Sequence, residues 1–326
     1  MGRNLELAIG VLNGTVGDYL ARTGNGLATE MAIIHDGAPL RLDPASLARA
    51  FPAATRKIVV LLHGLMNTEH VWAFPPSARG ADATESTADY GGSLARDHGY
   101  TPLYLRYNTG RSIPDNGASL DQLLTALVRA WPSDSDGGPV QELLLVGYSM
   151  GGLVVRSACH VAKLAAHDWL PRVHRILYIG TPHLGAPLER VGRVVSRGLR
   201  AVPDPYTQLI AQIADLRSDG LKDLGDADLR HEDRARRLHR VSLRDPNHPV
   251  PLLPEVRHYL VAGTLSAAPW AASLFGDIMV PVPSGTASTS ELPPERVAIL
   301  PGMSHVALAH HPAVYRQIHA WMANET

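Results

Sequence analysis

A serine stands between two glycines in the segment Gly147-Tyr148-Ser149-Met150-Gly151, after one apolar run and before another. A direct turn from strand to helix strains the backbone of its central residue, and glycines two positions away remove side chains that would collide. Such a turn lifts the serine hydroxyl off the sheet and places it at a helix N-terminus, where free N–H groups favour developing negative charge. The pattern predicts Ser149 as a nucleophile.

A serine hydroxyl is a poor nucleophile unless a base takes its proton, so the chain must also supply a histidine. His305 follows the last strand-like run, within the segment "GMSHVAL". Functional groups of parallel sheets lie at the carboxyl ends of the strands, so a loop histidine at this point can reach Ser149. We expect His305 to be the base, and a surface loop histidine is the alternative.

The acid that orients the histidine is expected at Asp277, in the segment "GDIMVPV". This residue lies between the apolar runs at 257–264 and 296–302, and it is followed by apolar residues. The order Ser149, Asp277, His305 is the chain order expected for such a triad. The alternative is a turn aspartate that caps the segment after it.

Two backbone N–H groups are expected to stabilise an oxyanion. The run at 57–64 ends in His63-Gly64, and the loop after it can turn the N–H of Leu65 toward the site. The N–H of Met150, directly after the nucleophile, is the second expected donor. His63 is expected to brace this loop by hydrogen bonding.

The elements that must position these residues alternate along the chain. Helical patterns lie at 119–131 and 151–167, and a C-terminal helix is expected at about 312–323. Continuous apolar strands separated by helices predict a parallel sheet covered on both faces. The predicted strands lie at 57–64, 101–108, 140–149, 173–182, 257–264 and 296–302.

The N-terminal part of the chain predicts two additional elements. An amphipathic helix, interrupted by Gly10 and Gly14, is indicated by apolar residues spaced three and four apart. These residues are Leu5, Ile9, Leu12, Val16 and Leu20. The segment "MAIIHDGAPLRLD" predicts an antiparallel hairpin with Asp36-Gly37 as its two-residue turn.

The interval 186–256 contains no strong strand pattern and carries charged helical patterns. A structureless insertion of this length inside a compact domain is improbable. We therefore expect a helical cap or lid at 188–250 within one domain spanning 1–326. A solvated helical excursion without a gating role is the alternative.

Composition excludes several classes of protein. The 30 basic and 31 acidic residues nearly cancel, which is unlike the basic footprint of a nucleic-acid binder. The only cysteine, Cys159, cannot form a disulfide within the chain. No stretch of apolar residues is long enough for a membrane span, and the N-terminus is a poor signal peptide, so a cytoplasmic location is expected.

The quoted motifs, together with "LLHGLM", "VGYSMGGLVVR" and "IGTPHLGAP", resemble those of the α/β-hydrolase superfamily. The similarity is to bacterial lipases and esterases and to GPI-inositol-deacylase-like serine hydrolases, and it spans roughly residues 57 to 308. It implies an α/β-hydrolase fold and a lid after "GTPHLG". Some lipases of this branch carry secretion signals or metal sites. Neither is visible here.

These residues predict a serine hydrolase that cleaves carboxylic esters through an acyl-enzyme, with no cofactor and no metal. Short- to medium-chain acyl esters are the favoured substrates. A lipase acting on long-chain lipid esters and an acyltransferase remain alternatives, and a hydrolase-like binding module is a third. Apolar residues near the motifs that could line an acyl pocket are Met66, Leu184, Trp270, Phe275 and Val306. The oligomeric state cannot be derived from the sequence.

Overall fold

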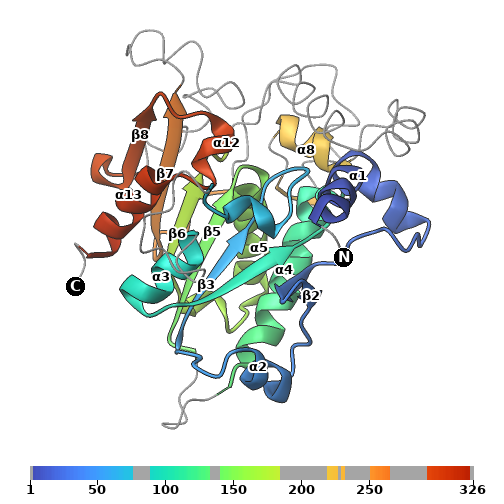
Figure 1. Cartoon of the computed structure of the whole chain (residues 1–326), viewed down its shortest axis with the longest axis horizontal. Coiled ribbons are helices and arrows are strands. Elements are labelled where there is room, and N and C mark those ends of the chain that lie inside the picture. Colours follow the sequence, from blue (N-terminus) through green and yellow to red (C-terminus); the bar gives the residue numbers. More distant parts are fainter. Residues whose placement is uncertain are drawn as a thin grey trace.

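A central sheet flanked by helices on both faces forms the body of the molecule (Figure 1). The computed structural model describes residues 3–75, 89–132, 140–183, 219–226, 229–231, 250–264 and 292–323. Within this part of the chain the sheet has eight strands in the order β2-β1-β4-β3-β5-β6-β7-β8. The strands are β1 (Ala32–His35), β2 (Ala38–Pro39), β3 (Lys57–Leu62), β4 (Thr101–Arg106), β5 (Glu142–Tyr148), β6 (Val173–Ile179), β7 (Arg257–Thr264) and β8 (Val297–Pro301).

Strands β3 to β8 run parallel, and their pairing places β3 between β4 and β5. The six predicted strands correspond to these six, so the mostly parallel sheet is confirmed. The predicted hairpin is confirmed as well, because β1 pairs with β2 and with β4 in antiparallel register. Asp36 and Gly37 have φ angles of 48° and 75°, as a two-residue turn with two left-handed positions requires.

The helices connect the strands. The described α-helices are α1 (Arg3–Arg22), α2 (Pro44–Ala50), α3 (Tyr90–His98), α4 (Ile113–Ala130), α5 (Met150–Ala165), α8 (Asp219–Asp226), α12 (His305–Leu308) and α13 (Pro312–Ala323). Short 3-10 turns lie at η1 (Glu69–Trp72), η4 (Leu170–Arg172) and η6 (Pro294–Arg296). The two predicted helices between strands and the C-terminal helix correspond to α4, α5 and α13.

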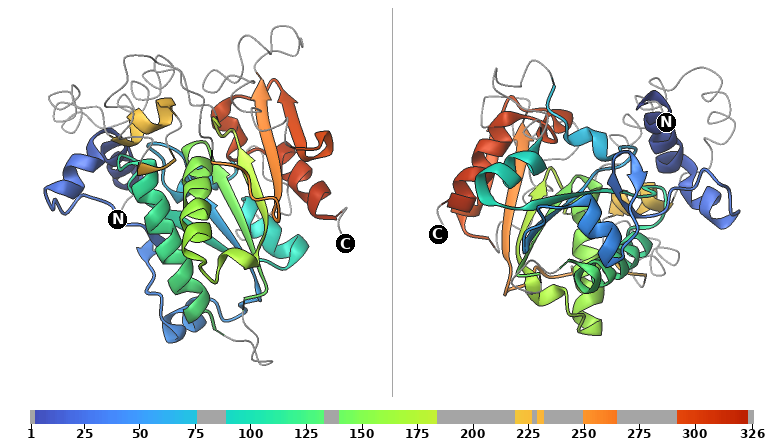
Figure 2. Two further views of the ribbon diagram at one scale, coloured as in Figure 1. Left: turned by 180° about the vertical axis from the view of Figure 1, so that it is seen from behind. Right: turned by 60° about the horizontal axis from the view of Figure 1, so that its bottom comes forward.

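The two faces of the sheet bury two separate apolar clusters, which follows from the alternation of side chains along a strand. In β3, Ile58, Val60 and Leu62 join one cluster, while Val59 and Leu61 join the other. The first cluster includes residues of α1, α4 and α5, and the second includes residues of α3 and α13. Figure 2 shows α4 and α5 together on one face.

Helix α1 differs from its prediction in one respect. The helix continues through Gly10 and Gly14, and the residue with non-helical dihedral angles is Val16, at φ −137° and ψ 18°. A Cβ on Gly10 would lie 3.0 Å from the Thr68 side chain, and one on Gly14 would lie 2.4 Å from the Met66 side chain. These glycines therefore permit close packing of α1 on the segment after β3.

Part of the expected cap segment is described, and it packs on the carboxyl edge of the sheet. The buried Asp223 of α8 accepts a hydrogen bond from the N–H of Ile113, at the start of α4, at 2.9 Å. The Gly220 N–H donates to the Gly110 carbonyl at 2.9 Å. Helix α8 is thus attached to the loop between β4 and α4.

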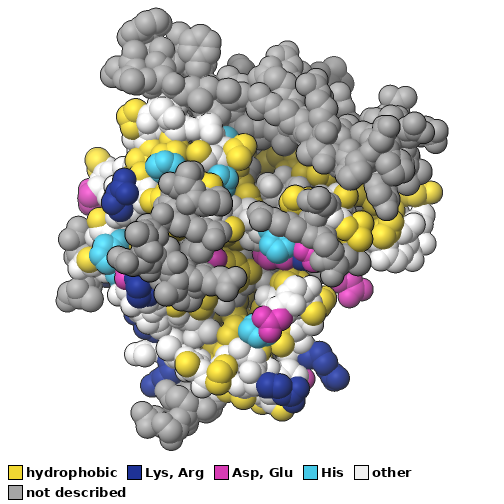
Figure 3. Space-filling model, in the orientation of Figure 1, with side chains coloured by type: hydrophobic (Ala, Val, Ile, Leu, Met, Phe, Trp, Pro, Cys, Tyr) yellow, Lys and Arg dark blue, Asp and Glu magenta, His cyan; other side chains and the backbone are white. Residues whose placement is uncertain are grey.

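The described surface has mixed charge. On the face drawn in Figure 3, the coloured Lys and Arg side chains are scattered among acidic ones and do not form a basic band. None of the helices in the described ranges combines the length and the apolar character needed to cross a bilayer.

Candidate active site

Ser149 occupies a sharp turn between β5 and α5. Its backbone has φ 53° and ψ −123°, a sparsely populated conformation for a residue with a side chain. A Cβ on Gly147 would lie 2.5 Å from Gly152 Cα, and a Cβ on Gly151 would lie 2.5 Å from the Leu62 carbonyl oxygen. Both glycines of the motif are therefore required by backbone contacts, as the sequence pattern predicts.

The turn is fixed to the neighbouring strand. The N–H of Ser149 donates to the carbonyl of Ile179, the last residue of β6, at 2.8 Å. The serine is buried, with 4% of its surface exposed, and it directly precedes the first residue of α5. A serine held at a helix N-terminus suits a reaction in which negative charge develops beside it.

His305 follows β8, as predicted, but it begins the short helix α12 instead of lying in an open loop. Ser304 is the N-cap of this helix, because its hydroxyl accepts a hydrogen bond from the N–H of Ala307 at 3.3 Å. The His305 side chain is buried, with 4% exposed. The surface loop histidine considered as an alternative is therefore wrong.

The structure places His305 beside the turn that carries Ser149. Its ring centroid lies 5.1 Å from that of Tyr148, and the Tyr148 hydroxyl donates to the His305 carbonyl at 3.1 Å. A Cβ on Gly180 would lie 3.1 Å from His305 Nδ1. Tyr148 precedes Ser149, and Gly180 follows Ile179, which binds the Ser149 N–H. The imidazole and the serine therefore lie near each other at the carboxyl ends of β5 and β6.

The loop after β3 borders Ser149 from the other side. A Cβ on Gly64 would lie 2.9 Å from Ser149 Cβ, so the backbone at Gly64 touches the serine. The N–H groups of Met66 and Asn67 are engaged, with Thr109 Oγ1 at 3.1 Å and with the Gly64 carbonyl at 3.2 Å. Leu65 stands between Gly64 and these anchored residues. Met150 opens α5, where the first N–H has no intrahelical acceptor.

His63 packs against this loop, as expected from the sequence. Its Nδ1–H donates to the Gly64 carbonyl at 2.9 Å, because a carbonyl can only accept, and its ring stacks on Tyr107 at 4.5 Å. Burial lowers the pKa of His63 to about 4, although the bond to Gly64 opposes this shift. His63 is therefore neutral near pH 7. The bond fixes the orientation of the Gly64–Leu65 peptide, whose N–H belongs to Leu65.

Several predicted site residues lie outside the described residues. They are the proposed acid Asp277, the pocket candidates Leu184, Trp270 and Phe275, and most of the cap segment 188–250. Two other pocket candidates are described. Met66 is 6% exposed and packs against Gly14 of α1, whereas Val306, next to His305, is 60% exposed.

Sequence reasoning did not single out the residues that hold the loop after β3. Tyr107 and Thr109 follow β4 directly and bind the loop through the His63 carbonyl and the Met66 N–H. The available signal was a polar segment at the carboxyl end of a predicted strand, the same rule that located His305.

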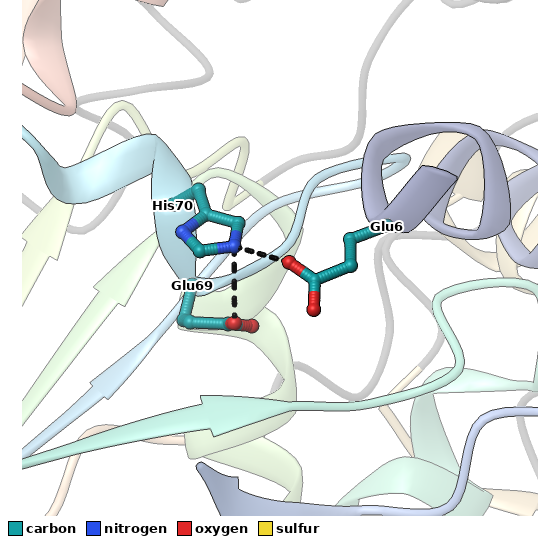
Figure 4. A group of neighbouring side chains, drawn as sticks. All are labelled: Glu6, Glu69 and His70. Atoms are coloured by element: carbon teal, nitrogen blue, oxygen red, sulfur yellow. Dashed lines mark hydrogen bonds and ion pairs between the residues drawn. The ribbon is translucent and has the colours of Figure 1, made fainter. Parts of the chain in front are cut away.

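A cluster of charged residues lies next to this loop, where α1 approaches η1 (Figure 4). The ligand atoms of Glu6, Glu69 and His70 lie within 4.8 Å of one another, which is close enough to bind a metal ion. However, Arg106 forms ion pairs with Glu69 and, at 3.5 Å, with Glu6. The guanidinium already supplies the cation for the buried carboxylate of Glu6 and the half-buried one of Glu69, so we interpret the group as an ion-pair cluster.

Comparison with known proteins gives similarity of structure only. No protein-family model and no curated protein sequence matches the chain. The lipase BlEst2 of Bacillus licheniformis, in its mature form, is 17% identical, covers 82% of this chain and 91% of its own, and has a TM-score of 0.46. An alpha/beta hydrolase fold protein from Chitinophaga pinensis is 12% identical, with coverages of 83% and 90% and a TM-score of 0.45. Est816, an N-acyl homoserine lactone degrading enzyme, is 13% identical, with coverages of 90% and 99% and a TM-score of 0.44.

The molecule's own architecture defines its class. A mostly parallel sheet carries a strained serine between a central strand and the helix after it, and a histidine follows the last strand. This combination is the α/β-hydrolase fold, with Ser149 at the strand-to-helix turn after a central strand.

Proposed function

We propose that the protein is a serine hydrolase that cleaves carboxylic esters through an acyl-enzyme. The observation that carries this proposal is the conformation of Ser149, held at φ 53° against Gly64 and beside the residues that contact His305. A glycine at this position would adopt the same backbone conformation without strain, so the fold alone does not require a serine here. A functional demand on the hydroxyl accounts for it.

In the proposed reaction, His305 accepts the proton of Ser149 while the serine oxygen attacks the ester carbonyl. The N–H groups of Leu65 and Met150 stabilise the resulting oxyanion, and Asp277 orients the imidazole and stabilises its charged form. The intermediate collapses when His305 donates the proton to the leaving alcohol. Water then gives its proton to His305, attacks the acyl-enzyme and releases the acid, with Ser149 regaining its proton.

The proposed substrates are short- to medium-chain acyl esters, and the proposed cap comprises residues 188–250. The contacts of α8 with the loop between β4 and α4 support a cap at the carboxyl edge. A chain-length series of p-nitrophenyl esters tests the substrate class. Activity that peaks on long-chain triglycerides and rises at an oil–water interface would instead indicate a lipase. Acyl transfer to an added alcohol in preference to water would indicate an acyltransferase.

The activity itself is tested with the Ser149→Ala variant and a fluorophosphonate probe. We expect wild-type protein to hydrolyse p-nitrophenyl butyrate and to be labelled at Ser149, and Ser149→Ala to lose both properties while keeping its melting temperature. Ser119→Ala is the matched control, because within the described ranges this hydroxyl binds the Asp115 carbonyl of its own helix α4, at 2.9 Å. Turnover that survives in Ser149→Ala would contradict the proposal.

The proposed acid is tested separately with Asp277→Asn. Replacing the orienting carboxylate of a triad by its amide lowers kcat by roughly 10⁴-fold, because the imidazole is held in the wrong tautomer. Labelling by the probe should slow in parallel. Activity within tenfold of the wild type would show that another carboxylate orients His305.

A further inference from the structure

The peptide that carries the Leu65 N–H is anchored through the peptides on both sides of it. The carbonyl of His63, in the preceding peptide, accepts from the Tyr107 hydroxyl at 2.7 Å. The N–H of Met66, in the following peptide, donates to Thr109 Oγ1 at 3.1 Å. Tyr107 and Thr109 come from the same segment after β4, and both are buried. One segment therefore holds the loop at two adjacent points.

Met66 needs such support because its backbone is strained. Its φ angle is 60°, a left-handed conformation that is uncommon for residues other than glycine and asparagine. A conformation of this kind persists only when its surroundings fix it. The buried hydroxyl of Thr109 supplies one constraint, and the backbone of α1 supplies another.

Helix α1 packs directly on Met66 through a stretch in which residues 10–17 are all buried. A Cβ on Gly14 would lie 3.1 Å from both the N and the Cα of Met66, so the helix backbone is in direct contact with that peptide. Leu65 and Met66 share one apolar cluster with Val11, Leu12 and Val16 of the helix.

The helix is in turn tied at two points to the segments that border the loop. Near its start, His70 Nε2 lies 2.6 Å from a carboxylate oxygen of Glu6, the contact drawn in Figure 4. Farther along, Asn108 Nδ2 donates to the Gly17 carbonyl at 2.8 Å. Asn108 lies between Tyr107 and Thr109, so the segment that anchors the loop also anchors the helix.

We propose that Thr109 is a positioning residue of the oxyanion hole, and that the Gly10 and Gly14 face of α1 holds the Met66 peptide against it. This proposal rests on the proposed function, in which the Leu65 N–H stabilises the oxyanion. Neither element touches the substrate. Both act by fixing the direction of an N–H group that must be in place before charge develops.

The size of the expected effect follows from related sites. Removing one donor of an oxyanion hole lowers kcat by roughly 10²- to 10³-fold, and a misplacement of about 1 Å costs up to roughly 10²-fold. A loosened donor should cost less than a deleted one. We therefore expect a fall of about 10- to 100-fold in kcat, with a much smaller change in KM, because the ester is bound before the oxyanion forms.

Four variants test the proposal. Thr109→Val keeps the shape of the side chain and removes the acceptor, whereas Thr109→Ser keeps the acceptor. Gly14→Ala introduces a methyl group against Met66, and Gly26→Ala is its matched control, because a Cβ on Gly26 meets nothing within 4 Å. We expect kcat on p-nitrophenyl butyrate to fall in Thr109→Val and Gly14→Ala, to return to within about threefold of wild type in Thr109→Ser, and to be unchanged in Gly26→Ala.

Amide hydrogen exchange of the peptide spanning residues 60–72 supplies a measurement that does not depend on catalysis. Exchange there should accelerate in Thr109→Val and Gly14→Ala and stay at the wild-type rate in Thr109→Ser and Gly26→Ala. Unchanged exchange in the first two variants would overturn the proposal, and so would faster exchange with kcat kept within threefold. Failure of the proposed function can be distinguished from failure of this proposal, because it would appear as undiminished turnover in the Ser149→Ala variant.

Discussion

The hydroxyl of Tyr148 donates a hydrogen bond to the backbone carbonyl of His305 across 3.1 Å. The residue before the proposed nucleophile therefore holds the backbone of the proposed base, and its ring also packs on the imidazole. Tyr148 and His305 lie 157 positions apart in the chain, and this contact joins them directly. We expect the spacing between Ser149 and His305 to depend on this contact.

Tyr148→Phe should lower activity more than it lowers stability. The substitution removes one buried hydrogen bond, worth about 1 kcal/mol, and leaves the ring in place. Because α12 can then shift relative to the elbow, we expect kcat for p-nitrophenyl butyrate to fall by roughly 3- to 10-fold. Tyr315→Phe is the control, since it removes a similar hydroxyl, bound to Asp97 at 2.7 Å, on α13. Equal kinetic effects of both variants would contradict this role of Tyr148.

Gly151→Ala should destabilise the whole domain. The new methyl group would lie 2.5 Å from the Leu62 carbonyl oxygen and 2.6 Å from that of His63. Both atoms belong to the backbone at the end of a buried central strand, so neither can move without disturbing the sheet. We expect the free energy of unfolding in urea to fall by about 3 kcal/mol or more, at the upper end of overpacking effects. A loss below about 1 kcal/mol would show that α5 can move away from β3.

Arg106→Leu tests the ion-pair cluster beside α1. Arg106 Nε donates to Glu69 at 2.8 Å, and the side chains of Glu69 and Glu6 are 9% and 7% exposed. Removing the cation leaves the buried Glu6 and the half-buried Glu69 without it, which should cost about 3 kcal/mol. The double variant Arg106→Leu with Glu69→Leu should recover part of that loss in chemical denaturation. Arg22→Leu breaks the exposed pair with Asp18 and should change stability by less than about 0.5 kcal/mol.

The pattern of apolar residues sufficed to predict the sheet, because buried parallel strands are continuous apolar runs and the helices between them are amphipathic. The turn at Ser149 was predictable because the glycine spacing is typical of a sharp strand-to-helix turn, in which Gly147 meets Gly152 of the same turn. The hairpin at Asp36-Gly37 was predictable for the same reason, since the turn residues themselves determine its type.

Contacts between distant segments were not predictable from local patterns. In the sequence, Gly10 and Gly14 look like interruptions of a helix. In the structure, they leave room for Thr68 and Met66 to pack against the helix backbone. Thr109 lies 43 residues from the N–H that it binds, and nothing in its own neighbourhood indicates that partner. The start of the helix at His305 likewise depends on one side chain. The Ser304 hydroxyl caps the four-residue helix α12.

Buried histidines should make the protein sensitive to mild acid. Burial lowers the pKa of His63 and of His258 to about 4, below the value near 6.5 expected in the unfolded chain. Between these values the unfolded state binds protons that the folded state does not, so stability is complete above about pH 6.5 and falls as the pH is lowered toward 4. Each histidine should lower the free energy of unfolding by about 2 kcal/mol at pH 5 relative to pH 7.

The variant His258→Phe tests this expectation, because it keeps a ring beside Tyr178. It should be less stable than wild type at pH 7 but lose less stability between pH 7 and pH 5. Urea denaturation at the two pH values measures both quantities, and an identical loss in the variant and the wild type would show that His258 already binds its proton in the folded state.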